Sequence, residues 1–185
     1  MKRIVTFVLV AVMSAFFTLH SDAQTFGGPE YMKGKKVFGG NITGGATGNY
    51  LHVGVAPQFG LRLTRSLELG TRLGYDLYFY HDYYYGRYFC HYVSGALYAN
   101  YDIISGIYLH AEDEEMCLFV SGKDVNANAP RWYNSVFVGA GYRQYAYDGS
   151  YVYYALLYNL SWDGFSGNSP YANPFVIRMG YCHAF

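Results

Sequence analysis

The sequence predicts an all-β fold in which eight antiparallel strands close into a barrel. The first observation is composition: Tyr and Gly contribute 23 and 22 of the 185 residues, and helix-favouring residues dominate no segment after residue 25. The second is an alternation of apolar with small or polar residues, which is the period of a β-strand. The third is that short links rich in turn residues separate these stretches.

The charge balance and the apolar content argue against a nucleic-acid partner and against a disordered chain. Lys plus Arg and Asp plus Glu number 13 each, and 14% of the residues are charged. A chain without a net basic field does not attract a nucleic-acid backbone electrostatically, so we expect no nucleic-acid partner. The 52% apolar content excludes a disordered chain.

The start of the chain is typical of a secretory signal peptide. Lys2 and Arg3 precede an apolar run of about 14 residues, shorter than the roughly 20 that a membrane-spanning helix needs. We expect residues 1–23 to be cleaved on export, residues 24–34 to form a periplasmic N-terminal segment, and residues 35–185 to form the barrel.

Eight alternating segments define the expected strands. In the second segment the odd positions from Leu51 to Leu63 are apolar, apart from Pro57, and the even positions are small or polar. The same register restarts at Leu67, and the last segment alternates from Phe175 to Phe185. The expected strands lie near residues 35–45, 50–63, 67–82, 88–103, 107–121, 132–147, 151–162 and 174–185.

The links between these segments alternate in length. Tight turns are expected at 64–66, 105–106 and 148–149, where Asp148-Gly149 suits a two-residue hairpin. Longer links are expected at 46–49, 83–87, 122–131 and 163–173. This alternation predicts that the tight turns and both barrel ends share the periplasmic side and the longer loops lie outside.

Alternation alone does not separate a soluble sandwich from a barrel in lipid. Segments of 10 to 16 residues exceed the five or six residues that are common in soluble strands. The export signal and the aromatics at segment ends also favour apolar faces turned outward, and open strand edges cannot exist in hydrocarbon. We therefore expect a transmembrane β-barrel with short loops in the cell outer membrane, in contact with outer-membrane lipid and lipopolysaccharide.

The chain also resembles known outer-membrane barrels. It is similar to small eight-stranded barrels of the OmpA/OmpX kind, and more closely to an uncharacterised outer-membrane barrel group common in Bacteroidota, whose members mostly lack an assigned activity. The resemblance covers residues 35–185 and implies a fold and a location; this chain differs from the group at Asp113 and Glu115, where aromatics are expected. It rests on Val55-Ala56-Pro57-Gln58-Phe59-Gly60, Leu109-His110-Ala111-Glu112, Val138-Gly139-Ala140-Gly141-Tyr142-Arg143-Gln144, Leu157-Tyr158-Asn159-Leu160, Ser169-Pro170-Tyr171-Ala172-Asn173-Pro174 and the terminal Phe185.

An ion network is expected in the barrel lumen. If Leu109 and Ala111 face lipid, the even-numbered residues of the same strand from 110 to 114 face inward. There they lie opposite inward arginines on other strands. Buried charges persist only when paired, so such a network would hold the barrel in shape; a proton relay or an ion path is the alternative. The expected members are His110, Glu112, Glu114, Arg143, Arg178, Arg62 and Arg72, with Glu68 and Asp76, and Tyr78, Tyr80, Tyr98 and Tyr153 should fill the remaining space.

No catalytic, cofactor or metal site is expected. His91 and Ser94 lie three residues apart on one strand and face opposite sides, which prevents a direct pair. Cys90 and Cys182 should face the lumen near opposite ends and Cys117 should point outward, so no disulfide is expected.

Three outward features are candidate contacts. Asp113 and Glu115 would point at lipid by simple alternation; a bulge, a position above the hydrocarbon or a partner protein would each explain them. The terminal residues Phe185, Tyr181 and Met179 resemble an assembly signal read by the outer-membrane insertion machinery. The tyrosine-rich tip at Tyr83, Tyr84 and Tyr85 would stack on a surface glycan or continue an aromatic girdle.

The sequence therefore favours a non-enzymatic structural or accessory outer-membrane protein with a plugged lumen. A subunit of a larger outer-membrane transport or assembly complex and a narrow pore are the alternatives, and a lipid A-modifying enzyme is a weaker one.

Overall fold

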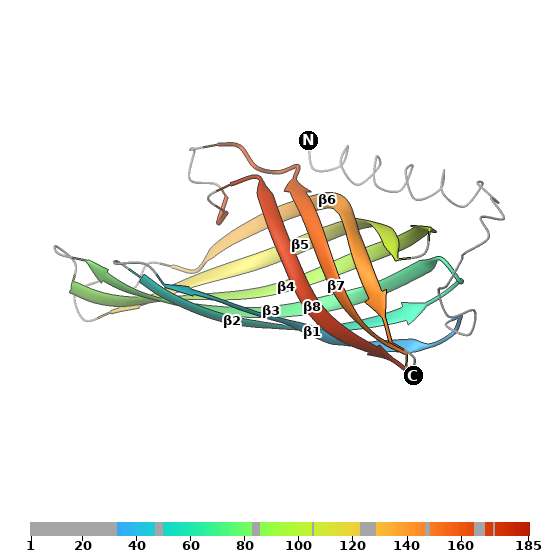
Figure 1. The fold of residues 1–185 in the computed structure, drawn as a ribbon. Coiled ribbons are helices and arrows are strands. Elements are labelled where there is room, and N and C mark those ends of the chain that lie inside the picture. Colours follow the sequence, from blue (N-terminus) through green and yellow to red (C-terminus); the bar gives the residue numbers. More distant parts are fainter. Residues whose placement is uncertain are drawn as a thin grey trace.

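Alternating residues build eight antiparallel strands that close into one barrel in the computed structural model (Figure 1). The structure describes residues 33–46, 50–82, 86–104, 106–122, 129–146, 149–164, 169–171 and 173–185. Across these ranges every regular element is a strand, and no helix there is long and apolar enough to cross a membrane. The strands are β1 (Lys36–Ala46), β2 (Tyr50–Arg62), β3 (Leu67–Asp82), β4 (Gly86–Ile104), β5 (Ile107–Gly122), β6 (Arg131–Tyr145), β7 (Ser150–Asn159) and β8 (Phe175–Ala184).

Each strand pairs with the next along the chain, and β1 closes the sheet on β8. Lys36 N donates to Phe185 O at 3.0 Å, and Phe185 N donates to Lys36 O at 2.9 Å. The first and last strands thus meet at one end of the barrel, which we call the proximal end; the opposite end is the distal end. The prediction of an eight-stranded antiparallel closed barrel is confirmed.

The barrel exposes its apolar rows and buries its charged ones. On β2 the outward residues Leu51, Val53 and Val55 are 50%, 53% and 46% exposed, and the outward apolar residues of β8 from Phe175 to Tyr181 are at least 53% exposed. The inward rows of the described strands contain eight buried charged side chains: Arg62, Glu68, Arg72, Asp102, Glu112, Glu114, Arg143 and Arg178. This arrangement is the reverse of a soluble core.

The strands differ in length. β3, β4 and β5 have 16, 19 and 16 residues, whereas β7 and β8 have 10 each. Figure 1 shows β7 and β8, in orange and red, rising steeply from the proximal end while the green strands β3 and β4 extend far beyond the closed part. The distal rim is therefore uneven.

The expected strands agree with the structure to within a few residues, and two details differ. The links at 47–49 and 83–85 have three residues, as short as the proximal ones, because β1 extends to Ala46 and β4 begins at Gly86, positions that were expected to lie in the links. The seventh strand ends at Asn159, three residues early, because the Asn159 side-chain oxygen accepts a hydrogen bond from Ser161 N at 2.9 Å and turns the chain.

The proximal link between β6 and β7 is also longer than a two-residue hairpin. It spans residues 146–149, with Gly149 at φ 85° and Ala146 N donating to Ser150 O at 2.8 Å. Asp148 lies outside the described residues.

All three cysteines are free and buried. Cys90 and Cys182 occupy inward positions on β4 and β8. Cys117 keeps an outward register position but is only 3% exposed, because it lies between Val93 and Trp132 on the neighbouring strands. The expectation of an outward register holds for Cys117, and the implied exposure does not.

Candidate functional site

Four charged side chains form a closed cluster in the proximal half of the lumen. Arg62 of β2 lies 2.6 Å from Asp102 of β4 and 3.3 Å from Glu68 of β3. Arg143 of β6 lies 3.1 Å from each of the same two carboxylates. Both arginines therefore share both acids, and four different strands are tied across the lumen.

Tyrosine rings enclose this proximal cluster. The guanidinium of Arg143 lies over the ring of Tyr108, 4.3 Å from its centroid, and 5.0 Å from the centroid of Tyr151. Arg62 also donates a hydrogen bond to the Tyr145 hydroxyl at 2.8 Å. Stacking of a guanidinium on an aromatic face is stabilising when water is excluded, so the rings support the pairs as well as filling space.

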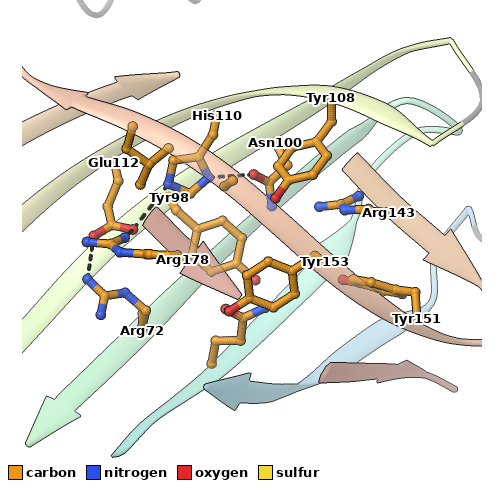
Figure 2. Close-up of a pocket in the computed structure, with 13 residues that line it drawn as sticks. Arg72, Tyr98, Asn100, Tyr108, His110, Glu112, Arg143, Tyr151, Tyr153 and Arg178 are labelled. Carbon is orange, nitrogen blue, oxygen red and sulfur yellow. Dashed lines mark hydrogen bonds and ion pairs between the residues drawn. The ribbon is translucent and has the colours of Figure 1, made fainter. Parts of the chain in front are cut away.

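A second cluster occupies the distal half of the lumen. Arg72 of β3 donates to Glu112 at 2.6 Å and to Glu114 at 2.7 Å, both on β5. Arg178 of β8 donates to the other oxygen of Glu112 and lies over the Phe137 ring, 4.9 Å from its centroid. Figure 2 shows Arg72, Arg178 and His110 converging on Glu112.

Tyr171, from the link between β7 and β8, completes the distal cluster. Its hydroxyl donates to Glu114, and its ring packs edge-on against Phe137 at 5.2 Å. Burial and the neighbouring negative charge of Glu114 raise the pKa of Tyr171 well above its ordinary range. The hydroxyl therefore keeps its proton and remains a donor.

Asn100 and His110 join the two clusters into one network. The Asn100 amide donates to Glu68 at 3.1 Å, and its oxygen lies 2.6 Å from His110 Nδ1. His110 Nε2 lies 3.2 Å from Glu112. Polar contacts thus run from the proximal cluster to the distal one along the lumen.

Little space remains between these side chains. One cavity, lined by network residues and by Tyr98, Tyr108, Tyr151 and Tyr153, leaves about 20 Å³ for the centre of a water molecule (Figure 2). That space and its polar lining suit about one buried water. The four buried arginines face four buried acids, so the buried network is electrically balanced, and side chains fill the space around it, as eight strands allow.

The structure pairs some expected residues differently. Glu112 of β5 contacts Arg178, whereas Arg143 pairs with Glu68 and Asp102 and not with the acids of β5. Among the described residues Asp76 contacts His52 and Thr43 and not an arginine: it lies 2.8 Å from His52 Nε2 and accepts a hydrogen bond from Thr43 at 3.0 Å. The inward tyrosines of the sequence prediction line the same space, with Tyr98 and Tyr153 buried and Tyr78 and Tyr80 half-buried near the distal end.

Sequence reasoning missed Asp102, Asn100 and Tyr171. The first two share the even, inward positions of β4 with Tyr98, so alternation was a sufficient signal for them. Tyr171 lies outside the strands, and no periodicity could have placed it in the lumen.

Asp113 and Glu115 are exposed on the outer face of β5. The Asn134 side chain on β6 donates to both carboxylates, at 2.9 and 3.1 Å. The ladder between β5 and β6 has no register shift, so a bulge that would turn these side chains inward is excluded. A position above the hydrocarbon and a contact with a partner both stay open.

The outer face also carries a Ser-His pair that sequence reasoning missed. His91 Nε2 lies 3.2 Å from Ser121 Oγ on the adjacent strand, and His91 Nδ1 lies 2.9 Å from the Tyr75 hydroxyl. A search along single strands could not find this pair because it joins two of them. The third member is a phenol where a catalytic triad has a carboxylate.

The residues of the expected assembly signal lie on the outer face, whereas the tyrosine-rich tip is not described. Phe185, Tyr181 and Met179 are 62%, 53% and 60% exposed on the outer face near the end of β8. Tyr83, Tyr84 and Tyr85 lie outside the described residues. Across the described ranges, no group of three or more His, Cys, Asp or Glu side chains could hold a metal ion.

No family model and no curated protein matches this chain. Among solved structures, it is similar to the crystal structure of the N-terminal β-barrel domain of Pseudomonas aeruginosa OprF, with 13% identity and a TM-score of 0.49. The match covers 83% of this chain and 98% of that one.

Proposed function

We propose that this chain is a non-enzymatic integral protein of the outer membrane, with a structural or accessory role and a lumen plugged by charged and tyrosine side chains. The observation that carries the proposal is the reversal of polarity: four arginines and four acids are buried inside while rows of Leu, Val, Ile and Phe are exposed. In water this distribution would be unfavourable on both faces, whereas in a bilayer both faces are matched.

The strand lengths support a membrane location. A tilted transmembrane strand needs about 9 to 11 residues, and the shortest strands, β7 and β8, have 10. If β7 and β8 just span the hydrocarbon, the additional residues of β3 to β5 project beyond it. We assign the distal end to the cell exterior, since longer links lie on the outer side of such barrels.

The filled lumen supports a structural role over a pore. The network crosses the lumen between β2, β3, β4, β5, β6 and β8, and each acid contacts at least one arginine. Ions would have to break these pairs to pass, and breaking a buried pair is costly.

Reconstitution tests this proposal. Purified protein in phospholipid vesicles should show heat-dependent electrophoretic mobility, typical of a folded barrel, and planar bilayers containing it should show no steady conductance. Lipid hydrolysis should be absent from both the wild type and Ser121→Ala. A steady unitary current would favour a pore, and hydrolysis lost in Ser121→Ala would favour an enzyme; either would overturn the proposal.

A specific observation also favours a second candidate, an accessory subunit of a larger outer-membrane complex. Away from the ends of the described strands, the charged side chains on the outer face are Asp113 and Glu115, beside the exposed Leu97. Carboxylates facing lipid are unfavourable. A partner protein that places a Lys or Arg side chain beside Asp113 and Glu115 would remove the unfavourable free energy of carboxylates facing lipid.

Co-purification in mild detergent tests the accessory role. A partner should remain bound to the wild type and to Asp163→Asn, which removes an exposed acid in the link after β7. It should be lost from the double variant Asp113→Asn/Glu115→Gln. Equal recovery from both variants, or no partner, would exclude this surface as the contact.

A further inference from the structure

Among the described residues, β1 and β8 pair with each other only over the proximal part of the wall between them. Its ladder has four residue pairs, from Val37 with Ala184 to Gly40 with Tyr181, whereas β7 and β8 share nine. Beyond this point residues 41–46 of β1 pair with β2, and residues 175–180 of β8 pair with β7. In Figure 1, β8 rises away from β1 beyond the shared proximal end. The distal part of this wall is a seam with two strand edges.

Glycines lie at the point where the seam opens. A Cβ at Gly180 would overlap the carbonyl oxygen of Gly40, and a Cβ at Gly39 would overlap that of Tyr181. Because glycine has no side chain, the two strands can approach closely at the point where the seam begins. Directly beyond it, the inward Asn41 is 9% exposed and its Oδ1 has no hydrogen-bond partner.

Neither edge carries the usual protection against pairing. Edges of soluble sheets are blocked by outward charges, prolines or bulges. Residues 41–46 contain no charge, and Arg178, the charge in the β8 edge, points inward to Glu112. The outward side chains Ile42, Ile177, Phe175 and Met179 are 79%, 74%, 61% and 60% exposed, among the most exposed apolar residues described.

The position of the seam along the membrane normal makes these edges unfavourable when they are left unpaired. β8 has just enough residues to span the hydrocarbon, so its distal half lies at the level of the outer leaflet if the proposed membrane location holds. Lipid tails cannot bond backbone N–H and C=O groups, and open edges are not tolerated there. A lipid chain does not satisfy the seam; a β-strand does.

We propose that the seam is a homodimer interface in which the β1 edge of one copy pairs with the β8 edge of a second copy. β1 and β8 are already antiparallel partners at the proximal end, so the edges are complementary in direction and in inward-outward alternation. Continuing the same register places Ile42 opposite Met179 and Gly44 opposite Ile177. A twofold axis along the membrane normal brings β1 of each copy opposite β8 of the other, so both seams are filled.

Disulfide trapping between distinguishable copies tests this interface. One copy carries Ile42→Cys with one tag, the other carries Met179→Cys with a second tag, and both are co-expressed and oxidised in native membranes. Oxidation should give a cross-linked product containing both tags. Leu97→Cys paired with Met179→Cys is the matched control, since Leu97 is 66% exposed on the opposite wall, and this pair should give no such product. Wild-type copies with the two tags control for the native cysteines.

A second variant removes the ambiguity of a negative result. The two substitutions in one chain, Ile42→Cys/Met179→Cys, report closure within a copy. If only an intramolecular disulfide forms, or native mass spectrometry of the folded barrel finds one copy, the interface is overturned while the proposed membrane function stands. If the protein does not fractionate with the outer membrane or show heat-dependent mobility, the proposed function itself fails.

Discussion

At the scale of single residues, stability depends on pairing. Each buried arginine contacts at least one carboxylate, and removing one member leaves the others charged in a space with little water. The sharpest case is Arg143, which holds both Glu68 and Asp102 and is itself held by two tyrosine rings.

Arg143→Ala should therefore lower the free energy of unfolding by about 3 to 5 kcal/mol, because two acids lose a partner. Chemical denaturation of the barrel in vesicles measures this loss. Arg131→Ala is the matched control on β6, where the side chain is exposed, and it should cost less than about 1 kcal/mol. Adding Glu68→Gln to Arg143→Ala should recover part of the loss; equal effects of the two alanine variants would contradict the network.

Tyr171→Phe removes only the hydroxyl that donates to Glu114. A hydrogen bond to a charged group contributes about 1.5 to 3 kcal/mol, so unfolding should become easier by that amount. Tyr158→Phe is the control, because Tyr158 is 42% exposed on the outer face and should tolerate the change. If both variants unfold like the wild type, the link after β7 does not secure the lumen.

At the scale of elements, β8 closes the barrel on β1, and the residue that follows it is expected to direct assembly. The backbone of Phe185 is fixed to Lys36 of β1 by two hydrogen bonds, while the Phe185 side chain is 62% exposed. The side chain therefore adds little to folded stability, and its expected role lies in recognition by the insertion machinery.

Phe185→Ala should reduce the amount of folded barrel in the membrane while leaving the unfolding free energy of purified protein within about 0.5 kcal/mol of the wild type. Phe175→Ala is the control at the other end of the same strand, where the side chain is 61% exposed. Quantifying folded protein in membrane fractions separates the two. Equal levels for both variants would make Phe185 an ordinary lipid contact.

The sequence predicted elements better than contacts for a physical reason. Alternation assigns each residue to a face, so the inward positions of His110, Glu112 and Arg143 could be anticipated. Alternation does not give the position of one strand relative to another along the barrel axis. The pairing of Arg143 with Asp102 could therefore not be predicted. Tyr171 and the early end of the β1–β8 ladder depend on a link and on curvature, neither of which has a sequence period.

At the scale of the whole molecule, apolar residues face outward and charged residues face inward, which is the distribution that the proposed membrane location requires. If the outward row of β2 contacts acyl chains, accessibility to a lipid-phase probe should follow the alternation of the strand. A soluble barrel with the same strands would show no such contrast.

Spin-label accessibility along residues 51–61 of β2, in protein reconstituted into phospholipid bilayers, tests this claim most directly. Labels at odd positions such as Val53, Val55 and Phe59 should collide with dissolved oxygen and be shielded from a water-soluble nickel chelate, whereas labels at even positions should be shielded from both. The result that would contradict the account is free collision of the nickel chelate with the odd positions, which would place the exposed apolar rows in water.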